Sequence, residues 1–105
     1  MMKSLARIRP QVSGPVPAIR VTDIQCHVLL APDYDASMTS SAQDSIVVLV
    51  HTDAGITGIG ETDANPWMVK ACIEAPGTHT MGLCLKDMVI GASPFDIPEI
   101  WERMY

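Results

Sequence analysis

The chain has 105 residues, of which 48% are apolar, and this is enough for the core of one small globular domain. A (β/α)8 barrel needs about 250 residues, so that fold is excluded for this chain. The longest uninterrupted apolar run, Ile46–Val50, is far shorter than the roughly 20 residues of a transmembrane helix. We therefore expect no contact with a membrane.

Charge and cysteine usage exclude two further classes. The first twenty residues hold four of the seven basic residues and none of the twelve acidic ones, so the remainder is strongly acidic. Because an acidic fold repels phosphate backbones, we expect no nucleic-acid partner. The three cysteines lack C-x-x-C spacing, which argues against a disulfide framework or a zinc ribbon and indicates a reducing, cytoplasmic setting.

The first forty-five residues predict a leader, a strand and a long loop. Residues 1–17 are rich in Pro, Ser and Gly, which predicts a flexible leader, so the domain is expected to span 18–105. Alternation from Ile19 to Leu30 predicts a strand whose second half is apolar enough to be buried on both faces. The small polar residues of 31–45 predict a loop, and loops of this length are usually binding loops, lids or disordered stretches.

A hairpin is predicted next. Strands at 46–52 and 56–62 flank the turn residues Asp53, Ala54 and Gly55, and the glycine can adopt positive φ. Gly58 and Gly60 share one face of the second strand, so another element could pack closely there. A phosphate-binding loop is not indicated, because the third glycine of that motif is missing.

Three helices are predicted after the hairpin. Asn65 can cap a helix that ends before Pro76, a second helix fits 81–90, and Asp96 can cap a third. The third helix has apolar residues at helical spacing: Ile97, Ile100, Trp101 and Met104. That stripe is still running at Tyr105, so we expect the chain to be cut within its last helix. The fold expected is α+β, a three-stranded antiparallel meander followed by a small helical bundle.

Two motifs in this order carry a family resemblance that extends over about 19–105. The first is T-D-A-G at 52–55 with Gly58, Gly60 and Glu61, and the second is G-A-S-P at 91–94 with Trp101, Met104 and Tyr105. Together they resemble the N-terminal capping domain of the enolase superfamily, in the mandelate racemase and muconate lactonizing enzyme branch. The sequence departs from the family at Ser93, where an acidic residue is common, and in lacking the barrel domain.

The resemblance implies a division of labour between two domains. In such enzymes a modified (β/α)8 barrel binds Mg²⁺ through carboxylates, and its Lys or His residues remove the proton α to a substrate carboxylate. The capping domain closes over the C-terminal face of the barrel. The chain is thus expected to be part of an acid-sugar dehydratase, racemase or cycloisomerase, but to have no catalytic residue and no metal ligand of its own. Its expected partners are a barrel domain, in the same or a second chain, and a small carboxylate substrate such as a sugar acid; a homo-oligomer is left open.

By the same resemblance, segments 31–45 and 61–67 match the two capping loops that contact substrate. The candidate substrate-contacting residues are Tyr34, Thr39, Ser40, Asn65 and Trp67. Four of them also have a plainer interpretation. Asn65 could be a helix cap only, Trp67 could be a core or interdomain anchor, and Thr39 and Ser40 could simply keep the loop soluble. Glu61 is expected to be structural, because no second carboxylate for acid/base work lies nearby in sequence.

Two other interpretations remain open. The chain could be one half of a split enzyme, or a self-standing α+β module whose long loop binds a small ligand or a protein. A capping domain separated from its barrel should expose an apolar surface formed by its methionines and tryptophans, whereas a self-standing module should not. His79 is not expected to be catalytic, because no acidic partner lies within reach in sequence.

Overall fold

A computed structural model describes residues 15–39 and 41–105, so most of the predicted leader lies outside the described residues. Three strands form one antiparallel sheet in the order β1-β2-β3: β1 (Val21–Leu30), β2 (Asp44–Thr52) and β3 (Thr57–Thr62). Three helices follow: α1 (Pro66–Glu74), α2 (Leu85–Val89) and α3 (Ile97–Met104). The α+β meander with helices after it is therefore confirmed.

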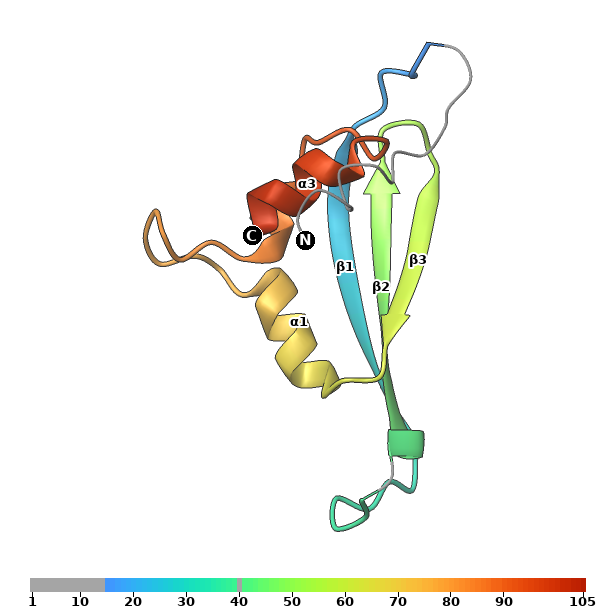
Figure 1. Ribbon diagram of the computed structural model, residues 1–105. Helices are drawn as coiled ribbons and strands as arrows, with labels where there is room; N and C mark the ends of the chain where they lie inside the picture. Colours follow the sequence, from blue (N-terminus) through green and yellow to red (C-terminus); the bar gives the residue numbers. More distant parts are fainter. Residues whose placement is uncertain (1–14, 40) are drawn as a thin grey trace, which may run out of the picture.

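The helices lie on the β1 side of the sheet, and β3 forms the opposite margin (Figure 1). The core is consequently small and centred on β1. Its buried apolar residues within the described part of the chain are Val21, Ile24, Cys26, Ile46, Cys84 and Ala92. None of the described helices has both the length and the apolar character that a membrane crossing requires.

In the second half of β1 only Cys26 is buried, and Val28 and Leu30 on the same face are half-buried and exposed, so the prediction of burial on both faces is wrong. Cys26 is buried, whereas Gln25, His27 and Leu29 are exposed on the other face of the strand. The reason is that one layer of helices covers one face of this sheet, and successive strand residues point to opposite faces.

The predicted hairpin joins β2 to β3. The Gly55 φ of +74° is one that side-chain-bearing residues rarely adopt. The Thr52 carbonyl accepts from the Gly55 N–H at 3.3 Å, and the Thr52 N–H donates to the Ile56 carbonyl at 3.1 Å. A Cβ at Gly58 or Gly60 would meet nothing within 4 Å, so the close packing expected there is not observed.

Two helices begin as predicted and one is shorter. The Asp96 carboxylate accepts from the Glu99 N–H at 3.4 Å and caps α3. The second helix covers only Leu85–Val89, not 81–90, because the preceding residues form a turn in which the Gly82 N–H donates to the His79 carbonyl at 3.0 Å. A Cβ at Gly82 would lie 2.7 Å from the His79 ring, so this turn is closely packed around its glycine.

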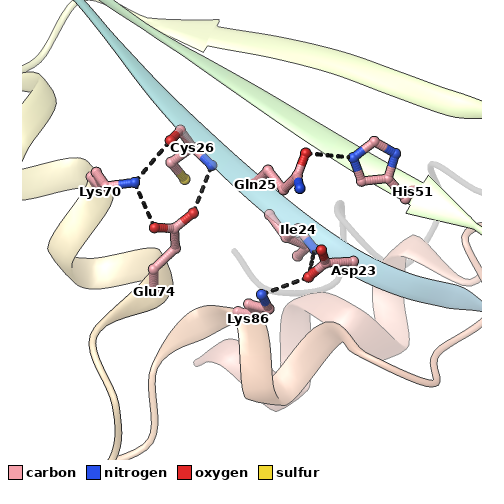
Figure 2. A network of polar contacts seen from close by, with 8 residues as sticks. All are labelled: Asp23, Ile24, Gln25, Cys26, His51, Lys70, Glu74 and Lys86. Carbon is pink, nitrogen blue, oxygen red and sulfur yellow. Dashed lines mark hydrogen bonds and ion pairs between the residues drawn. The ribbon is translucent and has the colours of Figure 1, made fainter.

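Helix α1 is attached to β1 by a polar cluster, formed by Cys26, Lys70 and Glu74 (Figure 2). The Cys26 N–H donates to Glu74 Oε1 at 2.7 Å, and Lys70 Nζ donates to the Cys26 carbonyl at 2.9 Å. Lys70 and Glu74 also form an ion pair at 2.7 Å. Since β1 is an edge strand, these side chains satisfy backbone groups that a neighbouring strand would otherwise bond.

Candidate functional site

The two predicted capping loops lie at the same end of the sheet (Figure 1). The first connects β1 to β2, and the second connects β3 to α1. This follows from the antiparallel order, since the end of β1, the start of β2 and the end of β3 are adjacent. A pocket of about 370 Å³ lies between the bases of these loops and is lined by Ser45, Glu61, Thr62 and Asp63.

The first loop is shorter than predicted, because a 3-10 turn at Ser41–Gln43 precedes β2 and the strand already begins at Asp44. Gln43 holds the ends of the loop together. Its side chain accepts from the Asp35 N–H at 2.7 Å and donates to the Asp35 carbonyl at 3.1 Å, while its own carbonyl accepts from the Ala31 N–H at 2.7 Å. A loop tied in this way has fewer conformations to lose when a ligand binds.

Asp35 orders the tip of the same loop. Its Oδ1 accepts from both the N–H of Ser37 at 2.9 Å and the Ser37 hydroxyl at 2.7 Å. These bonds, the hydroxyl one first, lower the pKa of Asp35 below its ordinary value. The Asp-x-Ser pattern is a known turn former, so the sequence held a signal for this turn that was missed.

The predicted residues of the first loop are available to a ligand. Tyr34 and Thr39 are exposed, and the Tyr34 N–H donates to the Ala31 carbonyl at 3.1 Å. Ser40 lies outside the described residues. Exposure leaves the phenol and the hydroxyl free of the core, as a substrate-contacting role requires.

In the second loop, Asn65 caps α1. Its Oδ1 accepts from the N–H groups of Trp67 and Met68 at 3.1 and 3.3 Å, so the capping interpretation is confirmed. Trp67 is 59% exposed, and the interpretation of this residue as a core anchor is therefore wrong. Its indole lies on the first turn of the helix, where the backbone beneath it is fixed by the Asn65 cap and by buried Pro66.

The pocket between the loops offers oxygen atoms. Glu61 and Asp63 contribute exposed carboxylates, while Ser45 and Thr62 contribute hydroxyls. Carboxylates accept hydrogen bonds, and hydroxyls both donate and accept, so the lining suits the hydroxyl groups of a ligand better than a second carboxylate. Sequence reasoning missed Ser45, Thr62 and Asp63 as candidates, although the predicted hairpin already places the start of its first strand beside the end of its second.

Other chemistry-bearing side chains have local roles. The His51 ring forms hydrogen bonds with Gln25 at 3.0 Å and with the Thr57 hydroxyl at 2.9 Å. Burial is the main reason that the pKa of the Cys26 thiol is raised, and a raised pKa makes this thiol a poor nucleophile. Among the described residues, no group of three or more His, Cys, Asp or Glu side chains could hold a metal ion.

Solved structures of other proteins contain a domain with a similar fold. A protein described as a predicted mandelate racemase, from Rhodobacter sphaeroides, matches with a TM-score of 0.68 and 25% identity over 81% of this chain and 22% of its own. A mandelate racemase-like protein from Bordetella bronchiseptica RB50, crystallised with 2-oxoglutarate/phosphate, matches with a TM-score of 0.60 and 23% identity. The match covers 82% of this chain and 22% of that protein. An isomerase-like protein from Sinorhizobium meliloti matches with a TM-score of 0.58 and 24% identity, over 80% of this chain and 24% of its own.

These matches confirm the resemblance to the enolase superfamily that the two sequence motifs indicate. No protein-family model matches the sequence. The chain spans less than a quarter of the length of the solved structures that it matches. It corresponds to one part of a mandelate racemase-like enzyme, whose other domain is outside the matched region.

Proposed function

We propose that residues 18–105 form the capping domain of an enolase-superfamily enzyme that removes a proton α to a carboxylate. The reaction class would be dehydration of an acid sugar, racemisation or cycloisomerisation. The observation that carries this proposal is the position of the two loops at the same end of the sheet, where a pocket is lined by Ser45 and Glu61–Asp63, in a fold shared with mandelate racemase-like proteins.

The domain would act by enclosing the substrate. Tyr34 and Thr39 on the first loop, and Trp67 on the first turn of α1 just after the second loop, are exposed, so they could cover the distal end of a sugar acid. The Trp67 indole suits the face of a sugar ring, and the carboxylates of Glu61 and Asp63 suit its hydroxyls. Closure of these loops would exclude water from the reacting end.

The catalytic groups would belong to a (β/α)8 barrel, in the same or a second chain. Mg²⁺ held by barrel carboxylates would stabilise the negative charge that develops when the α-proton leaves. No metal step is assigned to this chain, whose described residues provide no suitable cluster. Its contribution would be positioning, exclusion of water and selection of the substrate's distal groups.

Exposed apolar side chains on the helices support a missing partner domain. Trp101 and Tyr105 stack on α3 with ring centroids 6.5 Å apart, yet both rings belong to exposed residues. Ile97, Trp67 and Met68 on the helices are exposed as well, and Met81, in the turn before α2, is 90% exposed. A partner domain would cover side chains of this kind, which favours the capping domain over the self-standing binding module.

A mixing experiment tests the proposal. The purified chain would be combined with the barrel of a mandelate racemase-like enzyme that lacks its own capping domain, and complex formation would be followed by size-exclusion chromatography with light scattering. Dehydration and racemisation of a panel of sugar acids would then be assayed with Mg²⁺. We expect turnover in the mixture and none from either part alone. A chain that binds no barrel and confers no turnover would favour the binding module instead.

A further inference from the structure

The outer edge of β3 presents unpaired backbone groups. In the hairpin, the hydrogen bond between Thr52 and Ile56 fixes which β3 residues bond β2, because bonded and non-bonded pairs alternate along an antiparallel ladder. Ile59 faces Leu49 in a non-bonded pair, so its N–H and carbonyl point away from β2. The same holds for Thr57 and Glu61. No hydrogen bond to these outward N–H and carbonyl groups occurs within the described part of the chain.

This edge has few of the devices that usually prevent strand pairing, and the Glu61 carboxylate is its one charge. All six residues of β3 are exposed, none is proline or lysine, and Ile59 is 76% exposed. The helices lie on the β1 side of the sheet and do not cover this margin (Figure 1). An uncovered, regular edge with an exposed apolar side chain is a template for another strand.

We propose that this edge pairs with the same edge of a second copy of the chain, around a two-fold axis perpendicular to the sheet. The register that the sequence favours places Ile59 opposite Ile59 of the second copy and Thr57 opposite Glu61. All three residues point their backbone groups outward, so about six inter-chain hydrogen bonds would form. The two sheets would join into one continuous antiparallel sheet.

Side chains on both faces suit this register. On the open face, Leu49 lies beside Ile59, so pairing would create a continuous apolar row of two leucines and two isoleucines. On the other face, Gly58 would lie opposite Gly60, and a Cβ at either has nothing within 4 Å, so no side chain obstructs the approach.

The net charge of the chain determines how dimer formation should depend on salt. Each copy has a formal charge of −5, so two copies repel one another at low ionic strength. The proposed contact uses backbone bonds and apolar side chains, with no ion pair across it. Added salt screens the repulsion and should strengthen the dimer, whereas an interface held by ion pairs would weaken.

A charge substitution at the axis gives the first test. Light scattering and sedimentation would be measured over a hundredfold concentration range for the wild-type chain and for Ile59→Lys, which places two like charges against each other. Met81→Lys is the matched control, because Met81 is even more exposed but lies on the helical side. We expect the dimer to be lost in Ile59→Lys and kept in Met81→Lys, with unchanged circular dichroism in both. A wild-type monomer, or an Ile59→Lys dimer, would overturn the proposal.

Cross-linking tests the register. Residues opposite each other in a bonded pair have Cα atoms about 5.5 Å apart, which is within disulfide range. Ile59→Cys would be introduced after Cys72→Ser, because Cys72 is exposed whereas Cys26 and Cys84 are buried. We expect mild oxidation to give a covalent dimer from Ile59→Cys and not from Met81→Cys in the same background. Equal cross-linking of the two variants would indicate random collision and contradict the register. Because neither test uses a barrel or an activity assay, failure here leaves the proposed function to its own experiment.

Discussion

One amide oxygen determines where the loop between β3 and α1 ends. Oδ1 of Asn65 accepts from two backbone N–H groups at the start of α1, those of Trp67 and Met68. These N–H groups have no partner within the helix, and an N-cap side chain satisfies them. The orientation of the first helical turn, and with it the Trp67 indole, therefore depends on this cap.

We predict that Asn65→Ala lowers the free energy of unfolding by about 1 kcal/mol, the usual cost of losing an N-cap. Asn65→Asp is the matched control, since aspartate caps as well as asparagine, and it should retain the stability of the wild type. Urea denaturation followed by circular dichroism measures both. Equal destabilisation by the two substitutions would show that the amide has a role other than capping.

Glu74 is a residue at which stability should depend on pH. Its hydrogen bond from Lys70 is the main reason that its pKa lies below the ordinary value of 4.5, with the Cys26 N–H contributing. Because the folded pKa is lower than the unfolded one, the stabilisation is present above about pH 4.5 and is lost as the pH falls through the folded pKa.

We predict that Glu74→Gln destabilises the chain at pH 7 by about 1 kcal/mol, the size expected for a partly exposed charged hydrogen bond. The difference between variant and wild type should shrink on acidification, as the wild-type carboxylate becomes protonated. Glu102→Gln, at an exposed position on α3, is the control and should have little effect. Unfolding curves at neutral and acidic pH give the comparison, and a difference that does not change with pH would contradict the assignment.

At the scale of elements, local signals were sufficient for most of the fold. The turn glycine, the two caps and strand alternation each act within a few residues, and they predicted the hairpin and the starts of α1 and α3 correctly. The start of α2 was missed because it depends on packing of Gly82 against the His79 ring. The candidate loop residues were placed by family resemblance, and the pocket at Ser45 and Asp63 was missed although the predicted hairpin brings those two positions to the same end of the sheet.

The hairpin itself provides a prediction. Gly55 has φ of +74°, which costs a residue with a Cβ about 1 kcal/mol, so Gly55→Ala should lower the melting temperature. Gly58→Ala is the matched control, because a Cβ there meets nothing within 4 Å and no positive φ is involved. It should leave the melting temperature unchanged or raise it slightly. Thermal unfolding of both variants decides this, and equal losses would contradict the role assigned to the turn.

At the scale of the whole molecule, the sheet, its helices and its two loops match less than a quarter of the length of the solved structures they resemble. The pocket at the loop end of the sheet offers hydroxyls and carboxylates, and the described residues include no group of three or more metal-ligating side chains. Large apolar side chains on the helices remain exposed. The exposure of the tryptophans matches what the sequence analysis expects of a capping domain apart from its barrel, whereas the pocket was not foreseen.

The central claim is that this chain completes a barrel active site. The most direct measurement is turnover by a chimera in which residues 18–105 replace the corresponding segment of a mandelate racemase-like enzyme. Assays would use a panel of sugar acids with Mg²⁺, and the barrel without any capping domain would be the control. The account predicts Mg²⁺-dependent turnover by the chimera and none by the control. A folded chimera that is as inactive as the bare barrel on every substrate would contradict it.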